Sequence, residues 1–210
     1  MIVLAIDTCL GACSVAATSD GRPLAAASEP MTRGHQERLA PMAREVMARA
    51  DLDFAALDRI AVTVGPGSFT GLRVGLAFAK GLALALGKPC IGVGTLEALA
   101  ATLAEPGPLA VVIDSGRGQV YLQTFEAGRA LSPPQVLSLE EAGVRLAELN
   151  GGVLSGPGAA LLGDVAADCF QIRLVATPEP AAVARLAASA PAAPPTPLYL
   201  RPPDAKPKAA

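Results

Sequence analysis

Two segments of the chain carry the residue types of a phosphate-binding site. Asp7 ends an apolar run at residues 2–6, and a carboxylate at the carboxyl end of a strand could hold the magnesium ion of a nucleotide. The run Gly65-Pro66-Gly67-Ser68-Phe69-Thr70-Gly71 lies between an expected strand and an expected helix. That arrangement presents free backbone N–H groups to an anion. Both segments also have a structural interpretation: Asp7 can end its strand with turn hydrogen bonds, and glycines let backbones pack closely.

The known nucleotide motifs fit these segments poorly. The glycine loop lacks the lysine of a P-loop, and its spacing is not that of a dinucleotide fingerprint. The turn after Asp7 contains no glycine before Gly11. Ser68 and Thr70 fit helix caps better than nucleophiles, because no Gly-x-Ser-x-Gly elbow is present. Close backbone packing is therefore the favoured interpretation of the loop, with phosphate binding as the alternative.

The histidine and cysteine content predicts no metal site. His35 is the only histidine, which excludes sites that need two imidazoles, and it fits a capping or surface role. The 4 cysteines contain no C-x-x-C pair. Arg117, between two glycines of a polar turn, could contact an anion or be an ordinary turn residue. Asp7 and Arg117 together are the candidate vestigial nucleotide site.

Composition limits the class of protein. A chain of 210 residues, 51% hydrophobic and 17% charged, can bury the core of one domain or of two small ones. The net charge of −2 argues against a polybasic nucleic-acid binder. Asp7 interrupts the first apolar run, so no signal peptide is expected. Residues 74–86 are interrupted by Lys80 and are too short to span a bilayer. We expect a cytoplasmic protein that makes no membrane contact.

Hydrophobic periodicity predicts alternating strands and helices in the first half. A hairpin turn is expected at Asp20-Gly21. The second helix should be capped by Ser68 or Thr70 and end at Gly87, and Thr95 should cap the third. The expected strands are residues 2–6, 14–17, 23–28, 59–64 and 90–93, and the expected helices are residues 37–50, 71–86 and 95–103.

The pattern restarts after a break at residues 105–108. A second apolar run ends in Asp114, as the first ended in Asp7, which indicates an internal duplication. The end of the chain is proline-rich, with one strand-like stretch at residues 198–201. We predict an N-terminal lobe at residues 1–105, a C-terminal lobe at residues 106–203 and a flexible tail at residues 204–210. Elements expected in the second lobe are strands 109–113, 119–125 and 153–155 and a helix at residues 139–149.

The helix expected at residues 71–86 is apolar nearly all round. Its only charges are Arg73 and Lys80, so it needs cover on more than one side. Gly71, Gly75 and Ala79 recur every four residues and could form a flat groove for another helix. Two interpretations stay open: a partner helix covers it, or the rest of this fold does.

These motifs resemble the TsaB (YeaZ) family of the bacterial tRNA threonylcarbamoyladenosine machinery. The longest match is the run at residues 65–76 with Ala79-Lys80-Gly81. The matching segments also include Ile6-Asp7-Thr8, Ser14-Val15-Ala16, His35 with Leu39-Ala40-Pro41, residues 95–100, Val120-Tyr121 and Tyr199-Leu200-Arg201.

The resemblance implies an α/β fold with two lobes, like actin, Hsp70 and sugar kinases (the ASKHA fold), each lobe a mixed sheet with helices. It implies a non-catalytic scaffold subunit, without catalytic residues of its own, that heterodimerises with and supports a TsaD-like paralogue. A TsaE-like ATPase would join the complex, and tRNA would be contacted mainly indirectly. This chain alone would need no cofactor, ATP and metal would belong to partner subunits, and without a partner the chain would form a homodimer.

The resemblance and the apolar helix together predict the partner-binding residues. We expect Gly75→Arg to abolish partner binding while the fold stays intact. An ATP-dependent phosphotransferase of the same fold, with Asp7 and the glycine loop at the phosphates, is the alternative function. The predicted partner-binding residues are Leu39, Met42, Val46, Gly71, Leu72, Arg73, Gly75, Leu76, Phe78 and Ala79, and the glycine loop is represented by Gly65, Gly67, Ser68 and Thr70.

Overall fold

A computed structural model describes residues 1–166 and 168–201, so the predicted tail at residues 204–210 lies outside the described residues. The first lobe alternates strands and helices in the predicted order. Its elements are β1 (Ile2–Asp7), β2 (Ala12–Ser19), β3 (Arg22–Pro30), α1 (His35–Arg49), η1 (Phe54–Ala56), β4 (Arg59–Thr63), α2 (Phe69–Leu86), β5 (Cys90–Val93) and α3 (Thr95–Leu103).

The second lobe repeats this order of strands and helices, with additional short elements. Its elements are β6 (Pro108–Gly116), β7 (Gln119–Glu126), β8 (Arg129–Ala130), β9 (Gln135–Ser138), α4 (Leu139–Leu149), β10 (Gly152–Ser155), η2 (Ala159–Leu162), α5 (Gly163–Ala166), β11 (Phe170–Arg173) and α6 (Pro180–Ser189).

Each lobe contains one mixed sheet of the same topology. The strand order is β3-β2-β1-β4-β5 in the first lobe and β11-β10-β6-β7-β8 in the second, where β9 also pairs with β7. In the first sheet β1, β2 and β3 are antiparallel, and β4 and β5 run parallel to β1. Asp20 and Gly21 connect β2 and β3 at φ angles of 48° and 76°, as the hairpin prediction required. The predicted duplication and the two-lobed α/β fold are thus confirmed.

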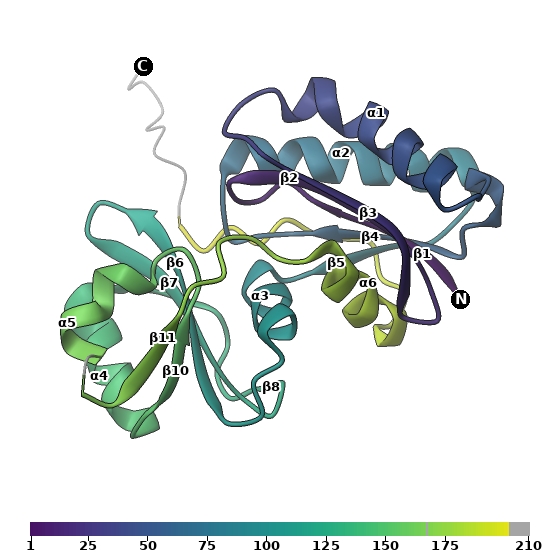
Figure 1. The fold of residues 1–210 in the computed structure, drawn as a ribbon. Coiled ribbons are helices and arrows are strands. Elements are labelled where there is room, and N and C mark those ends of the chain that lie inside the picture. Colours follow the sequence, from purple (N-terminus) through teal and green to yellow (C-terminus); the bar gives the residue numbers. More distant parts are fainter. Residues whose placement is uncertain (167, 202–210) are drawn as a thin grey trace, which may run out of the picture.

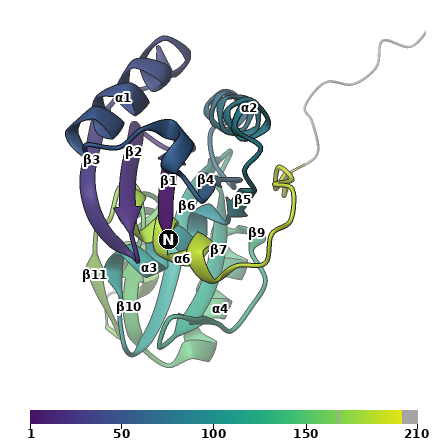
Figure 2. The ribbon, with the colours of Figure 1, turned by 90° about the vertical axis from the view of Figure 1, so that its right-hand side faces the viewer.

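The helices form layers on both sides of each sheet, as Figures 1 and 2 show. Alternating strand residues face α1 and α2 on one side of the first sheet and α6 on the other. In the second sheet, one face packs against α4 and η2 and the other against α3. The helices α3 and α6 are therefore exchanged between the lobes. The helix α3 follows β5 of the first sheet but covers the second sheet, and α6 follows β11 of the second sheet but covers the first.

Three local predictions differ from the structure. The proline-rich end contains an unpredicted helix, α6, which begins with Pro180 in its first turn. Residues 198–201 form no strand, although the Leu198 N–H donates to the carbonyl of Val64 (2.8 Å). Thr95 is the first residue of α3, and Gly94 holds the N-cap position. The predicted division into lobes is a separate point. The chain passes from the first sheet to the second between residues 105 and 108. The helix α6 lies within the predicted C-terminal lobe, residues 106–203, but it packs on the first sheet.

The ends of α2 follow local sequence signals. The Ser68 hydroxyl accepts a hydrogen bond from the Gly71 N–H, so Ser68 is the N-cap, and Thr70 lies inside the helix. Gly87 ends the helix at φ 64°, in the left-handed region that glycine adopts easily. The glycine loop is thereby fixed between β4 and the first turn of α2.

Candidate functional site

The glycine loop closes on the chain's own β1–β2 connection. The Ser68 N–H donates to the Cys9 carbonyl (2.7 Å), and the Thr8 hydroxyl donates to the Gly71 carbonyl (2.7 Å). A Cβ added at Gly67 would collide with the Cys9 carbonyl, and one at Gly71 with the Thr8 carbonyl. The glycines therefore permit close backbone approach, and residues 8–9 lie directly against the loop.

Asp7 performs a similar structural role at the end of β1. Its side chain is 0% exposed, and its Oδ1 accepts hydrogen bonds from the Thr63 hydroxyl (2.6 Å) and the Cys9 N–H (3.2 Å). Its Oδ2 is buried without a hydrogen-bond partner in the described part of the chain. Burial raises the pKa of Asp7 to about 6, because the charged form is poorly solvated there. Arg117, the other residue of the candidate nucleotide site, lies exposed in the β6–β7 turn.

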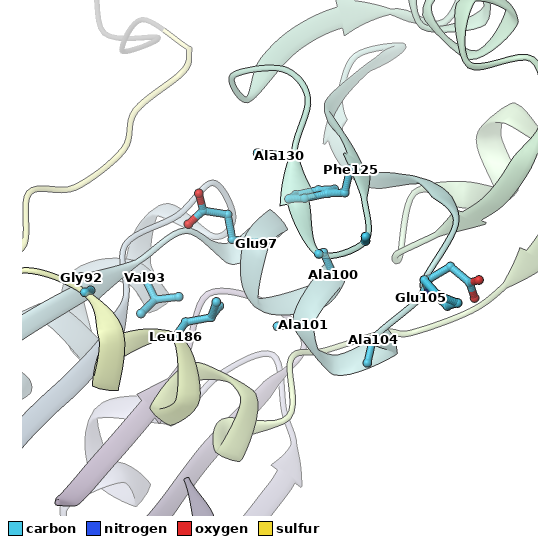
Figure 3. Close-up of a pocket in the computed structure, with 14 residues that line it drawn as sticks. Gly92, Val93, Glu97, Ala100, Ala101, Ala104, Glu105, Phe125, Ala130 and Leu186 are labelled. Atoms are coloured by element: carbon cyan, nitrogen blue, oxygen red, sulfur yellow. The ribbon is translucent and has the colours of Figure 1, made fainter. Parts of the chain in front are cut away.

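A pocket of about 620 Å³ lies between the lobes, and Figure 3 shows its walls. Its sides come from α3, α6 and the β7–β8 connection, with Phe125 and Ala100 among the apolar residues. The Glu97 carboxylate is on its wall, and Glu105 is paired with Arg173 (2.6 Å). The lining residues in the described ranges include no lysine or arginine. This pocket suits a triphosphate poorly, which weighs against the phosphotransferase alternative.

The structure places most of the predicted partner-binding side chains in the core of the first lobe. They pack in a cluster with residues of β1, β2 and β4 or lie against Thr8, so they are turned away from solvent, although Leu39 also lines the groove between α1 and α2. A Cβ at Gly75 would lie 2.5 Å from the Thr8 hydroxyl oxygen, so Gly75→Arg would disrupt the fold, contrary to the expectation above. The buried members are Leu39, Met42, Val46, Gly71, Leu72, Gly75, Leu76 and Ala79.

The opposite side of α2 is exposed and apolar. A groove of about 490 Å³ runs between α1 and α2. Of the predicted set, Arg73 is exposed and Phe78 is half-buried there. Two further apolar residues of α2, outside the predicted set, are more exposed: Phe69 is 53% exposed and Leu84 is 85% exposed. The groove-lining residues are Gln36, Leu39, Phe69, Thr70, Arg73, Val74, Ala77 and Phe78.

Possible metal ligands and membrane-spanning helices complete the description of the surface and core. Within residues 1–166 and 168–201, no group of three or more histidine, cysteine, aspartate or glutamate side chains could hold a metal ion. One helix, Phe69–Leu86, has the length and apolar composition of a membrane span. That is weak support for a span, because one row of α2 packs in the core.

Comparison with known proteins gives concordant results. A family model described as TsaD, tRNA N6-adenosine threonylcarbamoyltransferase, matches residues 28–151. A Pseudomonas aeruginosa protein, described as similar to the peptidase YeaZ, superposes with a TM-score of 0.82 at 31% identity. That match covers 95% of this chain and 99% of the other. The chain belongs to the TsaB (YeaZ) family.

Two more TsaB-family relatives agree with this placement. The structure of YeaZ from Pseudomonas aeruginosa has a TM-score of 0.76 at 30% identity, over 89% of this chain and 90% of that one. The Escherichia coli tRNA threonylcarbamoyladenosine biosynthesis protein TsaB is 38% identical over 129 residues. That match covers 60% of this chain and 55% of the E. coli protein, so the chain spans about half the length of this relative.

Proposed function

We propose that this TsaB-family protein is a non-catalytic subunit of the bacterial tRNA N6-threonylcarbamoyladenosine machinery. In this role it heterodimerises with, and supports, a TsaD-like paralogue. The E. coli relative carries that biosynthetic role in its name, and the matching family model is that of the transferase itself. A chain that shares the fold of its paralogue is well shaped to pack against it through equivalent helices.

The exposed groove between α1 and α2 is the single observation that carries the binding proposal. Phe69, Val74, Ala77 and Phe78 form an apolar strip on a helix whose other side is fully used by the core. Contiguous exposed apolar surface of this kind marks a protein–protein contact. A helix pair from the partner would bury this strip and complete the cover that α2 lacks.

The sealed glycine loop supports a non-catalytic role. Asp7 is buried, the loop faces Cys9 and Thr8, and the interlobe pocket has a carboxylate where a nucleotide would need cations. We accordingly assign ATP and metal to the partner subunits, including a TsaE-like ATPase. A net charge of −2 leaves most tRNA contact to the paralogue, and the complex would work in the cytoplasm. Without the paralogue, the same strip would pair with a second copy.

The test compares two alanines, one in the groove and one outside it. Ala77 is exposed on α2 within the groove, and Ala147 is exposed on α4 of the second lobe. Ala77→Arg places a bulky charge in the proposed contact, and Ala147→Arg is the matched control, because arginine is a good helix former at both positions. Light scattering after size-exclusion chromatography would measure complex formation with the TsaD-like paralogue from the same organism.

The expected result is a heterodimer for the wild type and for Ala147→Arg, and separate species for Ala77→Arg. A wild type that ignores the paralogue would refute the proposed function. A heterodimer that forms equally well with Ala77→Arg would show that the contact lies elsewhere on the chain.

A further inference from the structure

The last described segment of the chain, residues 190–201, is an extended strap that lies along the first lobe. The Leu198 N–H donates to the Val64 carbonyl (2.8 Å). Two glycines are needed beneath it: a Cβ at Gly65 would lie 3.0 Å from the Leu198 carbonyl oxygen, and one at Gly92 would lie 3.1 Å from Cβ of Pro195. The strap is therefore seated in a track that the first sheet provides, and it is visible beside β5 in Figure 1.

The strap ends by crossing to the second lobe. The Arg201 guanidinium donates to the Ser115 carbonyl (2.9 Å), the Gly116 carbonyl (3.1 Å) and Oε1 of Gln119 (2.7 Å). These acceptors lie at the adjoining ends of β6 and β7. Both ends of the segment around Tyr199 are thus fixed, one to each lobe.

Tyr199 completes an exposed aromatic cluster on α2. Its ring lies 5.6 Å from the ring of Phe69, centroid to centroid, and its hydroxyl accepts a hydrogen bond from Nε of Arg73 (3.3 Å). The Arg73 guanidinium in turn lies over the Phe69 ring at 3.7 Å. Phe69 and Tyr199 remain 53% and 47% exposed, in a chain with only 3% aromatic residues. Tyrosine and arginine are among the residue types that dominate binding energy at interfaces.

The cluster is continuous with the α1–α2 groove, because Phe69 and Arg73 line both. Arg73 is the only charged residue of the groove lining as described. A partner that fits this surface must therefore offer an apolar helix face with a carboxylate opposite Arg73. A second copy of the chain offers a poorer match, since its groove presents another arginine.

We propose that Tyr199 of the strap is part of the partner-binding surface, where it holds Phe69 and Arg73 against an acidic, apolar helix of the TsaD-like paralogue. This inference rests on the proposed function. It extends the contact from α2 to the strap, which follows α6 in sequence. Through Arg201, the same strap links the binding surface to the adjoining ends of β6 and β7.

The experiment measures the dissociation constant of the paralogue complex by isothermal titration calorimetry on the full chain. Tyr199→Ala should weaken binding by about tenfold, the loss expected for one central anchor. Tyr199→Phe keeps the ring contact and loses only the acceptor for Arg73, so its loss should be smaller. Phe69→Ala removes the stack from the helix side and should match Tyr199→Ala. Leu131→Ala, at a residue 53% exposed in the second lobe, is the control and should bind like the wild type.

The charge of the partner is tested at Arg73. Arg73→Glu should weaken binding more than Arg73→Met, because it places a carboxylate against a carboxylate. Equal weakening by the two variants, or tighter binding by Arg73→Glu, would overturn the acidic character of the partner face. Thermal melts of all variants would confirm that each is folded.

The outcomes separate this inference from the proposed function. If the wild type binds the paralogue and Tyr199→Ala and Phe69→Ala bind as tightly, the strap is not part of the surface and the proposed function stands. If the wild type does not bind, both fall. If Tyr199→Ala abolishes only self-association of the chain, the surface belongs to a second copy and the inference is overturned.

Discussion

Three glycines of one helix provide a sharp test of how the glycine loop is packed. Gly71 and Gly75 face the β1–β2 connection, whereas Gly81 is exposed, with nothing within 4 Å of an added Cβ. All three are helical positions at which alanine is intrinsically favoured over glycine by about 1 kcal/mol. Gly81→Ala should therefore stabilise the protein by about that amount.

The same substitution at Gly75 and Gly71 should have the opposite sign. At Gly75 the new Cβ lies 2.5 Å from the Thr8 hydroxyl oxygen, so Thr8 must move and its bond to the Gly71 carbonyl is lost. Overpacking costs about 1–3 kcal/mol and the lost hydrogen bond about 1 kcal/mol, so the free energy of unfolding should fall by about 1–3 kcal/mol net of propensity. At Gly71 the obstacle is the Thr8 carbonyl, which is backbone, so the loss should be larger still.

Urea denaturation followed by circular dichroism would give the three midpoints. The slopes should match that of the wild type, so that the midpoints report stability alone. If Gly71→Ala proves as stable as Gly81→Ala, the loop does not close on residues 8–9. The phosphate-binding interpretation of the loop would then return.

Two other predictions follow from buried and capping groups. Burial raises the pKa of Asp7 from 3.8 to about 6, so the folded state binds a proton more tightly than the unfolded state. The free energy of unfolding should therefore fall as the pH rises from about 4 to about 6, by about 1.4 kcal/mol per unit of pKa difference. Urea titrations across this pH range should show that Asp7→Asn removes the dependence. An unchanged pH dependence in Asp7→Asn would contradict the raised pKa of Asp7. The Ser138 hydroxyl accepts from the Glu141 N–H (3.2 Å) in a capping box at the start of α4. Ser138→Ala should lower the unfolding free energy by about 1 kcal/mol while Ser138→Asp restores it, and equal melting temperatures for the two variants would refute the role of the cap.

Elements with local signals could be predicted from the sequence. Ser68 and Gly87 delimit α2 because capping depends on residues a few positions apart. The sequence does not predict the helix α6, because clustered prolines are typical of irregular structure. Pro180 in fact occupies the first turn, where the missing N–H is harmless, and an alanine-rich stretch follows.

The exposed side of α2 could not be predicted in the same way. Periodicity identifies apolar rows, but α2 has apolar residues on both sides, and the row with Leu72 and Leu76 packs inward. The side of α2 that packs inward is set by the close approach of Gly75 to Thr8, a residue distant in sequence. The resemblance names α2 as a partner-binding helix, which stays a prediction, and most of the residues predicted from it are buried. Of the predicted residues, Leu39, Arg73 and Phe78 line the groove, and Leu39 among them is buried.

The exchange of α3 and α6 between the lobes has a consequence for folding. Val183 of α6 belongs to the same cluster as Val3 of β1, so the first sheet is sealed only when nearly the whole chain has been made. Such long sequence separations slow folding and couple distant segments. Neither half can bury both faces of its sheet alone, so the two lobes should unfold in a single cooperative transition. Cutting the chain between α3 and β6 would give two fragments, and each fragment would be soluble and native only in complex with the other.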